Sequence, residues 1–493
     1  MRQYDAVVVG SGPNGLSAAI CLARAGLSVV LYEAKDTVGG GLRSEELTLP
    51  GFVHDVCSAV HPLAKGSPFF STLPLQEHGL SWIDSPLVLA HPFTDGSCAV
   101  LETSIERTAK RLFKDSAAYE HIVGPLAAHW GDLSKDILAP LGMQRHPLLL
   151  ARFARYALQP ATRFMRTYFQ TDAMRALFAG LAAHSVLDLD RYITSSFGLV
   201  LMLLAHTAGW PIAQGGSRNI AKALASYFTS LGGTIVTDAA IESLDELSQH
   251  RLVLLDVGPK QFAQMAGRHL SDKSRRRFEA FRYGPGVYKI DWALSDPIPW
   301  KARECREAAT VHVCGSWQEV VESEKCVWEG RCSSSPFVLV SQPSLFDPTR
   351  VPSGRHTAWA YCHVPHGSDT DYRDVVEASI ERMASGFKEC ILAAHVRKAS
   401  EQESYNANLV GGDITGGVQD LYQLFTRPIV QRIPYRTPIK GVYLCSASTP
   451  PGGGVHGMCG FWAAHYALKD FGCVCKQSIE HFVRREKSDL ASV

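Results

Sequence analysis

The sequence lacks an excess of charge of either sign. Its 493 residues include 49 Lys and Arg and 48 Asp and Glu, which gives a formal net charge of +1 at pH 7. No overall field would therefore draw the protein onto nucleic acid or an acidic polymer. The sequence also has no G-x-S-x-G, H-E-x-x-H or G-x-x-x-x-G-K-[ST] motif, so it gives no support to a serine hydrolase, a zinc protease or a nucleotide triphosphatase.

Signals for secretion and for metal binding are weak. The first apolar run, Ala6 to Val9, is too short for the apolar region of a secretory signal, so we expect the mature chain to start here. The 13 cysteines are odd in number and most stand singly in apolar surroundings, which favours small core residues in a reducing cytoplasm. Cys473 and Cys475 have no nearby histidine or second cysteine pair to complete four ligands, so we expect no metal site.

A glycine fingerprint is present at the start of the chain. The segment YDAVVVGSGPNGLSAAICLARAGLSVVLYEA reads as strand, turn, helix and strand, with Gly10, Gly12 and Gly15 at the G-x-G-x-x-G spacing. These glycines allow a tight turn, close approach of the backbone to a pyrophosphate and close packing of the helix on the strand. Glu33 ends the second strand, where its carboxylate could accept hydrogen bonds from ribose hydroxyls. This loop predicts a dinucleotide site that comprises Gly10, Ser11, Gly12, Pro13, Asn14 and Gly15.

A second glycine cluster follows in EAKDTVGGGLRS, residues 33–44. Together with the loop, it resembles the second fingerprint of the flavoproteins with two dinucleotide-binding domains, which include amine oxidases and phytoene desaturases. Because Gly41 and Leu42 stand before Arg43, the chain is more similar to the phytoene dehydrogenase-like branch. The segments PGFVHDVCSAVHP, FDPTRVPSGRHTAWAYCHVPHG, GGDITGG and RPIVQRIPYRTPIKGVYLCSAS extend this resemblance over nearly the whole chain. It implies FAD as cofactor, with contacts at Glu33, Ala34, Gly40, Gly41 and Arg43.

A third glycine cluster, PPGGGVHGMCG, stands near the C-terminus at residues 450–460. The resemblance implies that this segment returns to the cofactor and opens a helix near Val455, whose N–H groups and positive dipole face the flavin. A charged imidazole would oppose that dipole, so we expect His456 to be neutral. Ser446 and Ala447 stand where the family usually has Gly-Ala. The implied contacts here are Ser446, Gly452, Gly453, Gly454, Val455 and His456.

The fold class that the resemblance implies is α/β: a discontinuous Rossmann-type FAD fold with a second, α+β substrate-binding domain. The FAD-binding domain is expected at 1–88, 211–285 and 428–475, the substrate-binding domain at 89–210 and 286–427, and a C-terminal tail at 476–493. The middle piece also shows a helix and two strands in its own pattern. There the family contacts adenine through a backbone position that corresponds to Ile241.

Two stretches raise the question of a membrane. Residues 138–168 contain no acidic residue but five arginines among apolar residues, a pattern of either a basic amphipathic helix in a bilayer interface or an ordinary surface helix. We therefore keep a peripheral membrane contact through 138–168 as one expectation for a cytoplasmic protein. Residues 192–217 contain no Asp, Glu, Lys or Arg, but glycines and a proline interrupt them, so we expect a buried core helix.

Catalytic residues are harder to infer because a flavin supplies the chemistry. Lys289, in the strand-like YKIDWAL, is one candidate because related oxidases place a lysine near the flavin, and an exposed strand lysine is the alternative. His363 and His366 could exchange a proton near the substrate or could be ordinary structural histidines.

The sequence thus indicates an FAD-dependent oxidoreductase that desaturates, saturates or isomerises a long apolar substrate such as a carotenoid-type isoprenoid or lipid. One alternative is a flavin amine oxidase, for which the C-terminal region offers Tyr435, Tyr443, Phe461 and Trp462 as candidates for an aromatic cage. The other is a flavin-bound assembly or chaperone protein without turnover. Oxygen, a quinone and a nicotinamide all remain candidates for the electron acceptor.

Overall fold

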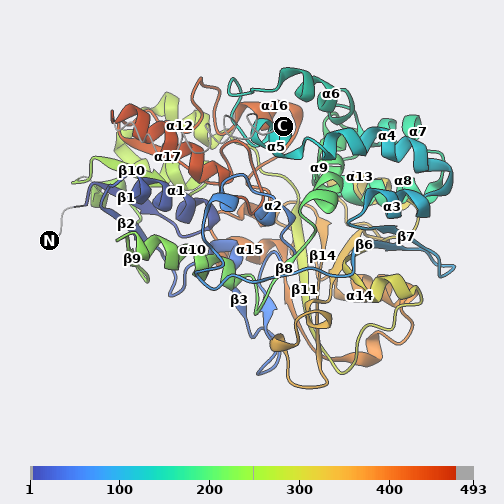
Figure 1. The fold of residues 1–493 in the computed structure, drawn as a ribbon. Helices are drawn as coiled ribbons and strands as arrows, with labels where there is room; N and C mark the ends of the chain where they lie inside the picture. Colours follow the sequence, from blue (N-terminus) through green and yellow to red (C-terminus); the bar gives the residue numbers. More distant parts are fainter. Residues whose placement is uncertain (1–3, 248, 473–493) are drawn as a thin grey trace.

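Two sheets organise the chain, and each is the centre of one lobe (Figure 1). The computed structural model describes residues 4–247 and 249–472. The tail expected at 476–493, Cys473 and Cys475 lie outside the described residues. The mixed α/β architecture confirms the predicted fold class.

The first lobe, here the nucleotide lobe, contains a parallel five-stranded sheet of order β16-β10-β1-β2-β9. Its strands are β1 (Ala6–Val9), β2 (Val29–Tyr32), β9 (Thr234–Val236), β10 (Leu252–Leu255) and β16 (Val442–Leu444). The central strands are apolar throughout because both faces of a parallel sheet are buried. These strands come from the three sequence ranges in which we expected the FAD-binding domain.

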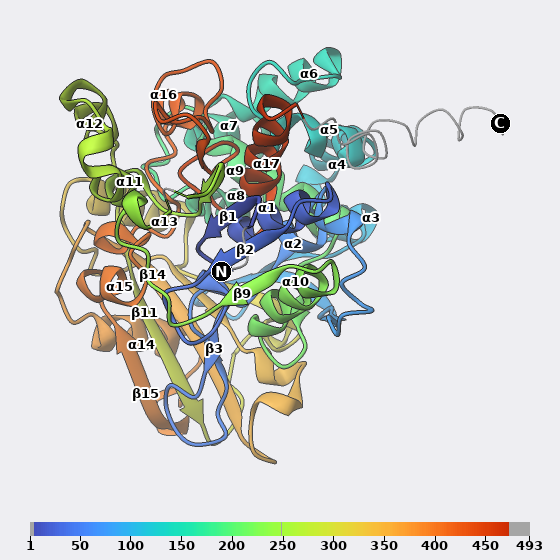
Figure 2. The same cartoon turned by 90° about the vertical axis from the view of Figure 1, so that its left-hand side faces the viewer.

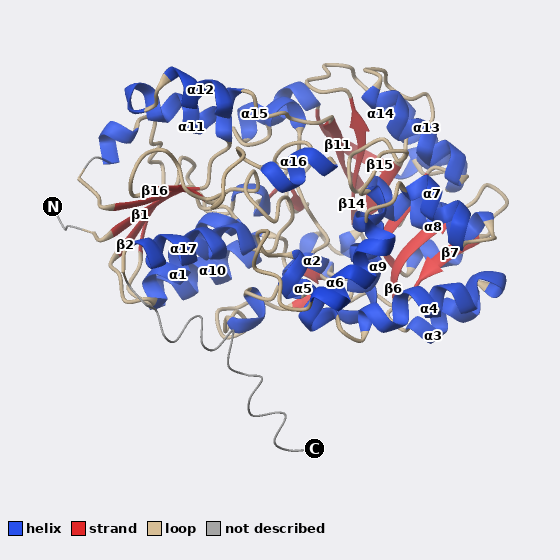
Figure 3. Cartoon of the chain, turned by 90° about the horizontal axis from the view of Figure 1, so that it is seen from above, coloured by secondary structure: helices blue, strands red, loops and turns tan. Residues whose placement is uncertain are grey.

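Helices cover both faces of this sheet (Figure 3). One face carries α1 (Pro13–Arg24), α10 (Arg218–Ser230) and α17 (Met458–Asp470), and the other carries α11 (Pro259–Ala266) and α12 (Asp272–Glu279). Helix α17 begins at Met458, later than the predicted start near Val455, because Gly457 has a φ of +69° and is not helical. Gly460 lies so close to α1 that a Cβ there would be 1.9 Å from the carbonyl oxygen of Asn14.

The second lobe, here the substrate lobe, contains a seven-stranded sheet of order β15-β11-β14-β13-β12-β6-β7. Its strands are β6 (Leu87–Pro92), β7 (Cys98–Leu101), β11 (Gly286–Leu294), β12 (Ala308–Val313), β13 (Val338–Ser341), β14 (His356–Val364) and β15 (Ile391–Arg397). All neighbours are antiparallel except β12 and β6. Figure 2 shows the long strands β11, β14 and β15 below β1, β2 and β9.

Most helices of the substrate lobe form one cluster on one side of its sheet. They are α3 (Ile105–Arg111), α4 (Ser116–Ala127), α5 (Trp130–Ile137), α6 (Pro147–Ala157), α7 (Ala161–Tyr168), α8 (Asp172–Ala183), α9 (Thr194–Thr207) and α13 (Trp317–Trp328). Helix α14 (Arg373–Met383) packs on the opposite side. Shorter elements join the lobes: α2 (Pro62–Lys65), α15 (Ala399–Tyr405), α16 (Leu421–Thr426), and the two-stranded pairs β3 (Ser44–Glu45) with β4 (His54–Asp55) and β5 (Trp82–Ile83) with β8 (Ile212–Ala213).

Two expectations about helices have different outcomes. The basic stretch 138–168 does not form one helix, because Gln159 and Pro160 separate α6 from α7. The uncharged stretch 192–217 does contain a core helix, α9, in which Leu199, Met202, Leu203 and Leu204 are buried. Within residues 4–247 and 249–472, no helix combines the length and the apolar character that a membrane crossing requires.

Candidate active site at the lobe interface

A single cavity of about 1370 Å³ joins the two lobes. At one end it is lined by the N-terminal glycine loop and by the C-terminal glycine segment. At the other end it is lined by α6, α9 and the substrate-lobe sheet. It exceeds the 300–1,000 Å³ that is typical of a pocket for one small ligand.

The N-terminal loop shapes the first end of the cavity. Gly10 has a φ of +95° and turns the chain from β1 into α1, which begins with Pro13. Gly10, Ser11, Gly12, Pro13 and Asn14 all line the cavity. Gly15 does not line it, but a Cβ there would lie 2.0 Å from the Gly10 carbonyl oxygen. The predicted close packing of helix on strand therefore explains this glycine.

Glu33 is buried and already bonded on both oxygens. Oε2 accepts a 3.0 Å hydrogen bond from the backbone N–H of Ser11 and another from the Ser11 hydroxyl. Oε1 accepts from the backbone N–H of Lys35 and lies 3.1 Å from Nη2 of Arg43. Arg43 thus balances the Glu33 charge and fixes the carboxylate at the cavity wall. Glu33, Ala34, Gly40, Gly41, Arg43 and Ile241 line the cavity as well.

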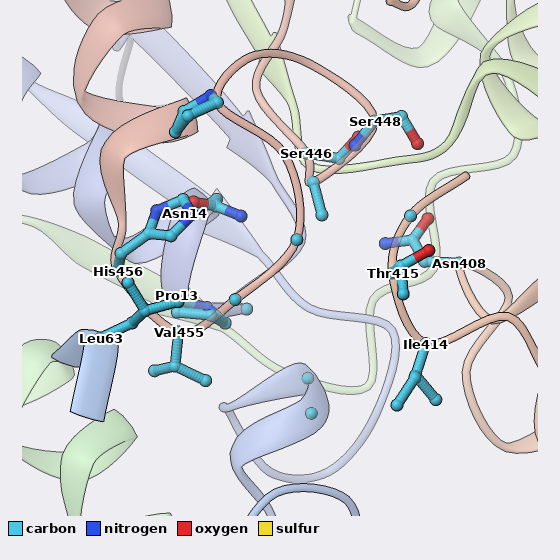
Figure 4. Close-up of a pocket in the computed structure, with 18 of the residues that line it drawn as sticks. Pro13, Asn14, Leu63, Asn408, Ile414, Thr415, Ser446, Ser448, Val455 and His456 are labelled. Carbon is cyan, nitrogen blue, oxygen red and sulfur yellow. The ribbon is translucent and has the colours of Figure 1, made fainter. Parts of the chain in front are cut away.

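The C-terminal glycine segment closes the same end (Figure 4). Ser446, Gly453, Gly454, Val455 and His456 line the cavity. Burial lowers the pKa of His456 to about 4, and its Nδ1 accepts a hydrogen bond from the backbone N–H of Met458 at 3.0 Å. The imidazole is therefore neutral at the start of α17, as expected.

Gly452 differs from the other predicted contacts of the C-terminal segment because it does not line the cavity. A Cβ there would lie 2.9 Å from Nη1 of the buried Arg427. That guanidinium donates hydrogen bonds to the carbonyl oxygens of Ala447, Gly417 and Val418 at 3.0 to 3.1 Å. Gly452 thus makes room for an arginine that holds the surrounding loops together.

Asp256 is a cavity residue that the sequence analysis missed. It follows β10 directly, at the carboxyl end of the sheet, and its Oδ2 accepts a 2.9 Å hydrogen bond from the backbone N–H of Gly15. Burial raises its pKa to about 7, and nearby Glu33 adds to the shift. An acidic residue directly after an apolar parallel strand was the available signal. Asn408, Ile414 and Thr415 also line the cavity, opposite Pro13 and His456 (Figure 4), and no motif marked them.

Lys289 lines the cavity from the middle of β11. It is only 4% exposed and forms an ion pair with Asp291, which is 1% exposed. Burial lowers the pKa of Lys289, and Asp291 opposes this shift. The Lys289 ammonium also lies 5.8 Å from the centre of the Trp359 ring, another cavity residue. The alternative of an exposed strand lysine is therefore wrong.

The histidine candidates lie elsewhere. His363 does not line the cavity; it is buried, with Nδ1 2.8 Å from a carboxylate oxygen of Glu324 on α13. The position of His363 therefore gives no support to substrate contact. His366 donates a hydrogen bond to the Gly284 carbonyl oxygen at 2.8 Å. His54 and Asp55, which lie within the family-like segment PGFVHDVCSAVHP, are absent from the cavity wall, and Asp55 is paired with the buried Arg350.

The far end of the cavity is mainly apolar. Its wall includes Leu150, Phe153, Phe197, Val200, Leu201 and Trp210. Some large apolar cavity residues are also exposed at the surface, among them Leu141 at 62%, Leu158 at 44% and Phe425 at 42%. The apolar chamber thus opens between α6 and α16. Among the described residues, no group of three His, Cys, Asp or Glu side chains is placed to hold a metal ion.

Comparisons with known proteins agree with this geometry. Residues 8–71 match the NAD(P)-binding Rossmann-like domain. The chain is 25% identical to pyridine nucleotide-disulfide oxidoreductase domain-containing protein 2 of Rattus norvegicus, over 95% of this chain and 94% of that protein. It is 23% identical to the lycopene-forming phytoene desaturase of Pseudescherichia vulneris, over 92% and 96% of the two chains. The solved structure of putrescine oxidase bound to putrescine superposes with a TM-score of 0.60 and 15% identity, over 96% and 99% of the chains.

These findings confirm the resemblance to the phytoene desaturase-like oxidoreductases. They identify the chain as an enzyme, an oxidoreductase that uses a flavin or nicotinamide cofactor. The alternative of an assembly protein without turnover has no support among these relatives.

Proposed function

We propose that this relative of the phytoene desaturases is an FAD-dependent oxidoreductase that acts on C–C bonds of a long apolar substrate. The substrate class is a carotenoid-type isoprenoid or a related lipid, and the reaction is desaturation, with saturation or isomerisation as variants. The observation that carries the proposal is the single cavity that joins the glycine loops to an apolar chamber. A polar substrate would lose its hydration in that chamber and would find too few hydrogen-bond partners there to compensate for the loss.

The glycine loops fit FAD better than a nicotinamide dinucleotide. The Rossmann-like match covers residues 8–71, but the cavity also takes Ser446 and residues 453–456 from the opposite end of the chain. These additional backbone segments extend the cradle beyond a simple dinucleotide site. FAD would be held by Gly12, Asn14 and Glu33 at its nucleotide end and by Gly453 and Gly454 farther along. When bound, FAD supplies the electron acceptor for oxidation of a C–H bond.

The residues of the chain would then position the substrate and move a proton. The apolar wall of the chamber excludes water and aligns an extended hydrocarbon along the sheet. Desaturation would remove two hydrogens from adjacent carbons. Bound FAD would supply the acceptor for one of them as a hydride equivalent, and the other would leave as a proton that a residue of the chain must take up. Lys289 is the ionisable cavity residue on β11. Burial lowers its pKa, with Asp291 opposing the shift, so the neutral amine that would accept a proton is more accessible than in an exposed lysine. Asp291 would stabilise the ammonium that forms.

An anaerobic titration tests this function. The purified protein is reconstituted with FAD, and its visible absorbance is recorded as polyene lipids, amines and NADPH are added separately. Bleaching of the flavin by a polyene lipid is the expected result. Bleaching only by amines or only by NADPH would contradict the proposed substrate class.

A flavin amine oxidase is the second candidate, and one observation favours it. Trp359 and Tyr361 both line the cavity beside Lys289, with ring centres 5.2 Å apart and planes at 83°. The aromatic residues that we expected near the C-terminus do not serve this role: Tyr435, Tyr443, Phe461 and Trp462 are buried in the nucleotide lobe and line no part of the cavity. Release of hydrogen peroxide with putrescine would support this candidate.

We also propose that the chamber opens toward a lipid surface. Leu148 is 87% exposed on α6, and Tyr422 is 66% exposed on α16, near the exposed Leu158 and Phe425 of the cavity wall. Arg152 is exposed on the same helix as Leu148 and would attract anionic head groups. An apolar substrate could then enter without crossing water.

Sedimentation with vesicles tests this contact. Wild type should bind phosphatidylcholine vesicles that contain phosphatidylserine, and Leu148→Glu with Leu158→Glu should abolish binding. Phe113→Glu is the matched control, because Phe113 is 83% exposed but is not part of the cavity wall. Equal binding of all three proteins would contradict the proposal.

A further inference from the structure

His184 brings a hydrogen-bonding group into the apolar chamber. It follows α8 directly and lines the cavity together with Val200, Leu201 and Trp210. Its ring lies 6.1 Å from the Trp210 ring in a T-shaped arrangement. A polar side chain in such a wall must find its partner either in the protein or in the ligand.

A second histidine lies directly behind it. Nε2 of His184 is 3.2 Å from Nε2 of His312, which is fully buried on β12. Burial lowers the pKa of His184 to about 3, and it holds the pKa of His312 well below its ordinary value. Both rings are therefore neutral at physiological pH, and each carries one N–H.

The surroundings of His312 decide which nitrogen carries that hydrogen. Among the described residues, Nδ1 of His312 is buried without a hydrogen-bond partner. A Cβ on Gly180 would lie only 2.4 Å from this Nδ1, so the glycine backbone packs directly against it. A buried N–H group without an acceptor is rarer in proteins than a buried acceptor atom without a donor. His312 therefore carries its hydrogen on Nε2 and donates it to Nε2 of His184.

This arrangement fixes the form of His184. Since its Nε2 accepts from His312, its single hydrogen must be on Nδ1. The only hydrogen bond of the His184 ring within the described part of the chain is the one at Nε2, so Nδ1 has no partner there. Nδ1 is also not one of the buried atoms without a partner, and His184 lines the cavity, so this nitrogen is accessible from the chamber. The chamber therefore contains an N–H donor that has no acceptor among the described residues.

We propose that His184 binds an oxygen atom of the substrate, so that the enzyme selects long apolar molecules that carry a hydroxyl, ether or keto group. This inference rests on the proposed function and narrows its substrate class. His312 acts as a positioning residue, because it fixes the hydrogen of His184 on the nitrogen that faces the ligand.

The sheet also sets where that oxygen lies along the substrate. Lys289 pairs with Tyr361, Tyr361 with Leu339, and Leu339 with His312, so these four residues form one row across β11, β14, β13 and β12. The three spacings of about 4.8 Å between these four strands give about 14 Å between the ends of the row. Three bonds of an extended chain span about 3.5 Å. An oxygen held by His184, whose ring adjoins His312 at the end of this row, would therefore lie about a dozen bonds from the carbon atoms that face Lys289.

A binding experiment tests the inference without turnover. The probes are the methyl ether of geranylgeraniol, which can only accept a hydrogen bond, and the tetraene hydrocarbon of the same skeleton without oxygen. Affinities for the FAD-loaded protein in detergent are measured by quenching of tryptophan fluorescence. The wild type should bind the ether more tightly than the hydrocarbon by about 2- to 10-fold, which corresponds to one neutral hydrogen bond.

Variants assign this preference to His184. In His184→Leu the ratio of the two affinities should fall to one, and in His184→Gln, which retains an N–H donor, it should be largely kept. His312→Leu should weaken the preference because Nδ1–H is no longer enforced. Ser196→Ala is the matched control, because Ser196 lines the same cavity but its hydroxyl donates to the Ile193 carbonyl oxygen.

The outcomes are separable from those of the proposed function. Each probe partitions into detergent to the same extent in every sample, so this effect cancels when the ratio of ether to hydrocarbon affinity is compared between wild type and variants. Melting curves show whether the variants are folded. An unchanged ether preference in His184→Leu, or no preference in the wild type, would overturn the inference. Failure of every polyene to bleach the flavin would instead refute the proposed reaction, whatever the binding ratio.

Discussion

The backbone N–H of Gly15 donates a 2.9 Å hydrogen bond to Oδ2 of Asp256, although 241 residues separate the two. This bond ties the start of α1 to the end of β10, the position where a dinucleotide phosphate is expected to bind. The carboxyl group is buried beside Gly12, where an added Cβ would lie 2.7 Å from the same oxygen. A titratable group thus lies directly below the phosphate cradle.

Asp256→Asn should change the pH dependence of stability. The pKa of Asp256 is about 7 in the folded protein, above the ordinary value of 3.8, so the folded state binds this proton more tightly. The associated stabilisation is present at low pH and is lost as the pH rises from about 4 to about 7. Asparagine keeps an acceptor for Gly15, so the variant should be more stable than the wild type at pH 8 and equal or less stable at pH 4.

Urea unfolding at both pH values measures this difference, and the affinity for FAD provides a second measurement. Ionised Asp256 repels the pyrophosphate, so the wild type should bind FAD more weakly above pH 7, whereas Asp256→Asn should not. Parallel pH profiles for the two proteins would show that Asp256 does not titrate in this range.

Gly460→Ala should disrupt the contact between α17 and α1. The added Cβ would meet the backbone oxygen of Asn14 at 1.9 Å, and backbone atoms cannot rotate away as a side chain could. We expect a loss of about 1–3 kcal/mol or more in the free energy of unfolding, with weaker FAD binding. Gly131→Ala in α5 is the control, because no atom outside its own helix and chain neighbours lies within 4 Å of its Cβ position; it should gain about 0.5–1 kcal/mol. Equal effects of the two substitutions would contradict the close packing.

Lys289→Met should impair both stability and proton transfer. The substitution leaves Asp291 buried without its partner, which destabilises proteins by about 3–5 kcal/mol. The double variant Lys289→Met with Asp291→Asn removes both charges and should recover most of that stability. If Lys289 accepts the substrate proton, flavin reduction should stay slow in both variants, by about 10²-fold or more. Stopped-flow reduction and chemical unfolding measure the two effects, and recovery of the rate in the double variant would give Lys289 a structural role only.

Local motifs indicated which residues line the glycine-loop end of the cavity, because glycine spacing encodes backbone geometry. Gly10, Gly12 and Gly453, which belong to the glycine motifs, all line the cavity. Asp256, Asn408 and Thr415 could not be inferred in this way, because chain topology brings them to the site from loops without a motif. The same holds for the row from Lys289 to His312, which depends on the register of four strands.

Misinterpretations of the sequence also have physical causes. The arginine-rich stretch 138–168 has the composition of one amphipathic helix, but Pro160 removes a backbone donor and ends that pattern between α6 and α7. His363 lies on the same face of β14 as the cavity residues Trp359 and Tyr361, but farther along the strand it packs against helix α13 instead of lining the cavity. Its partner Glu324 comes from α13, 39 residues away.

His363 and Glu324 provide the last prediction, which separates a structural histidine from a catalytic one. Both side chains are buried and joined at 2.8 Å, so His363→Leu alone should destabilise the protein by about 3–5 kcal/mol because Glu324 remains without a partner. The double variant His363→Leu with Glu324→Leu should recover stability by removing both polar groups. Since neither residue lines the cavity, the rate of flavin reduction by substrate in the double variant should stay within about twofold of the wild type. A loss of rate with restored stability would instead place His363 in the path of the proton.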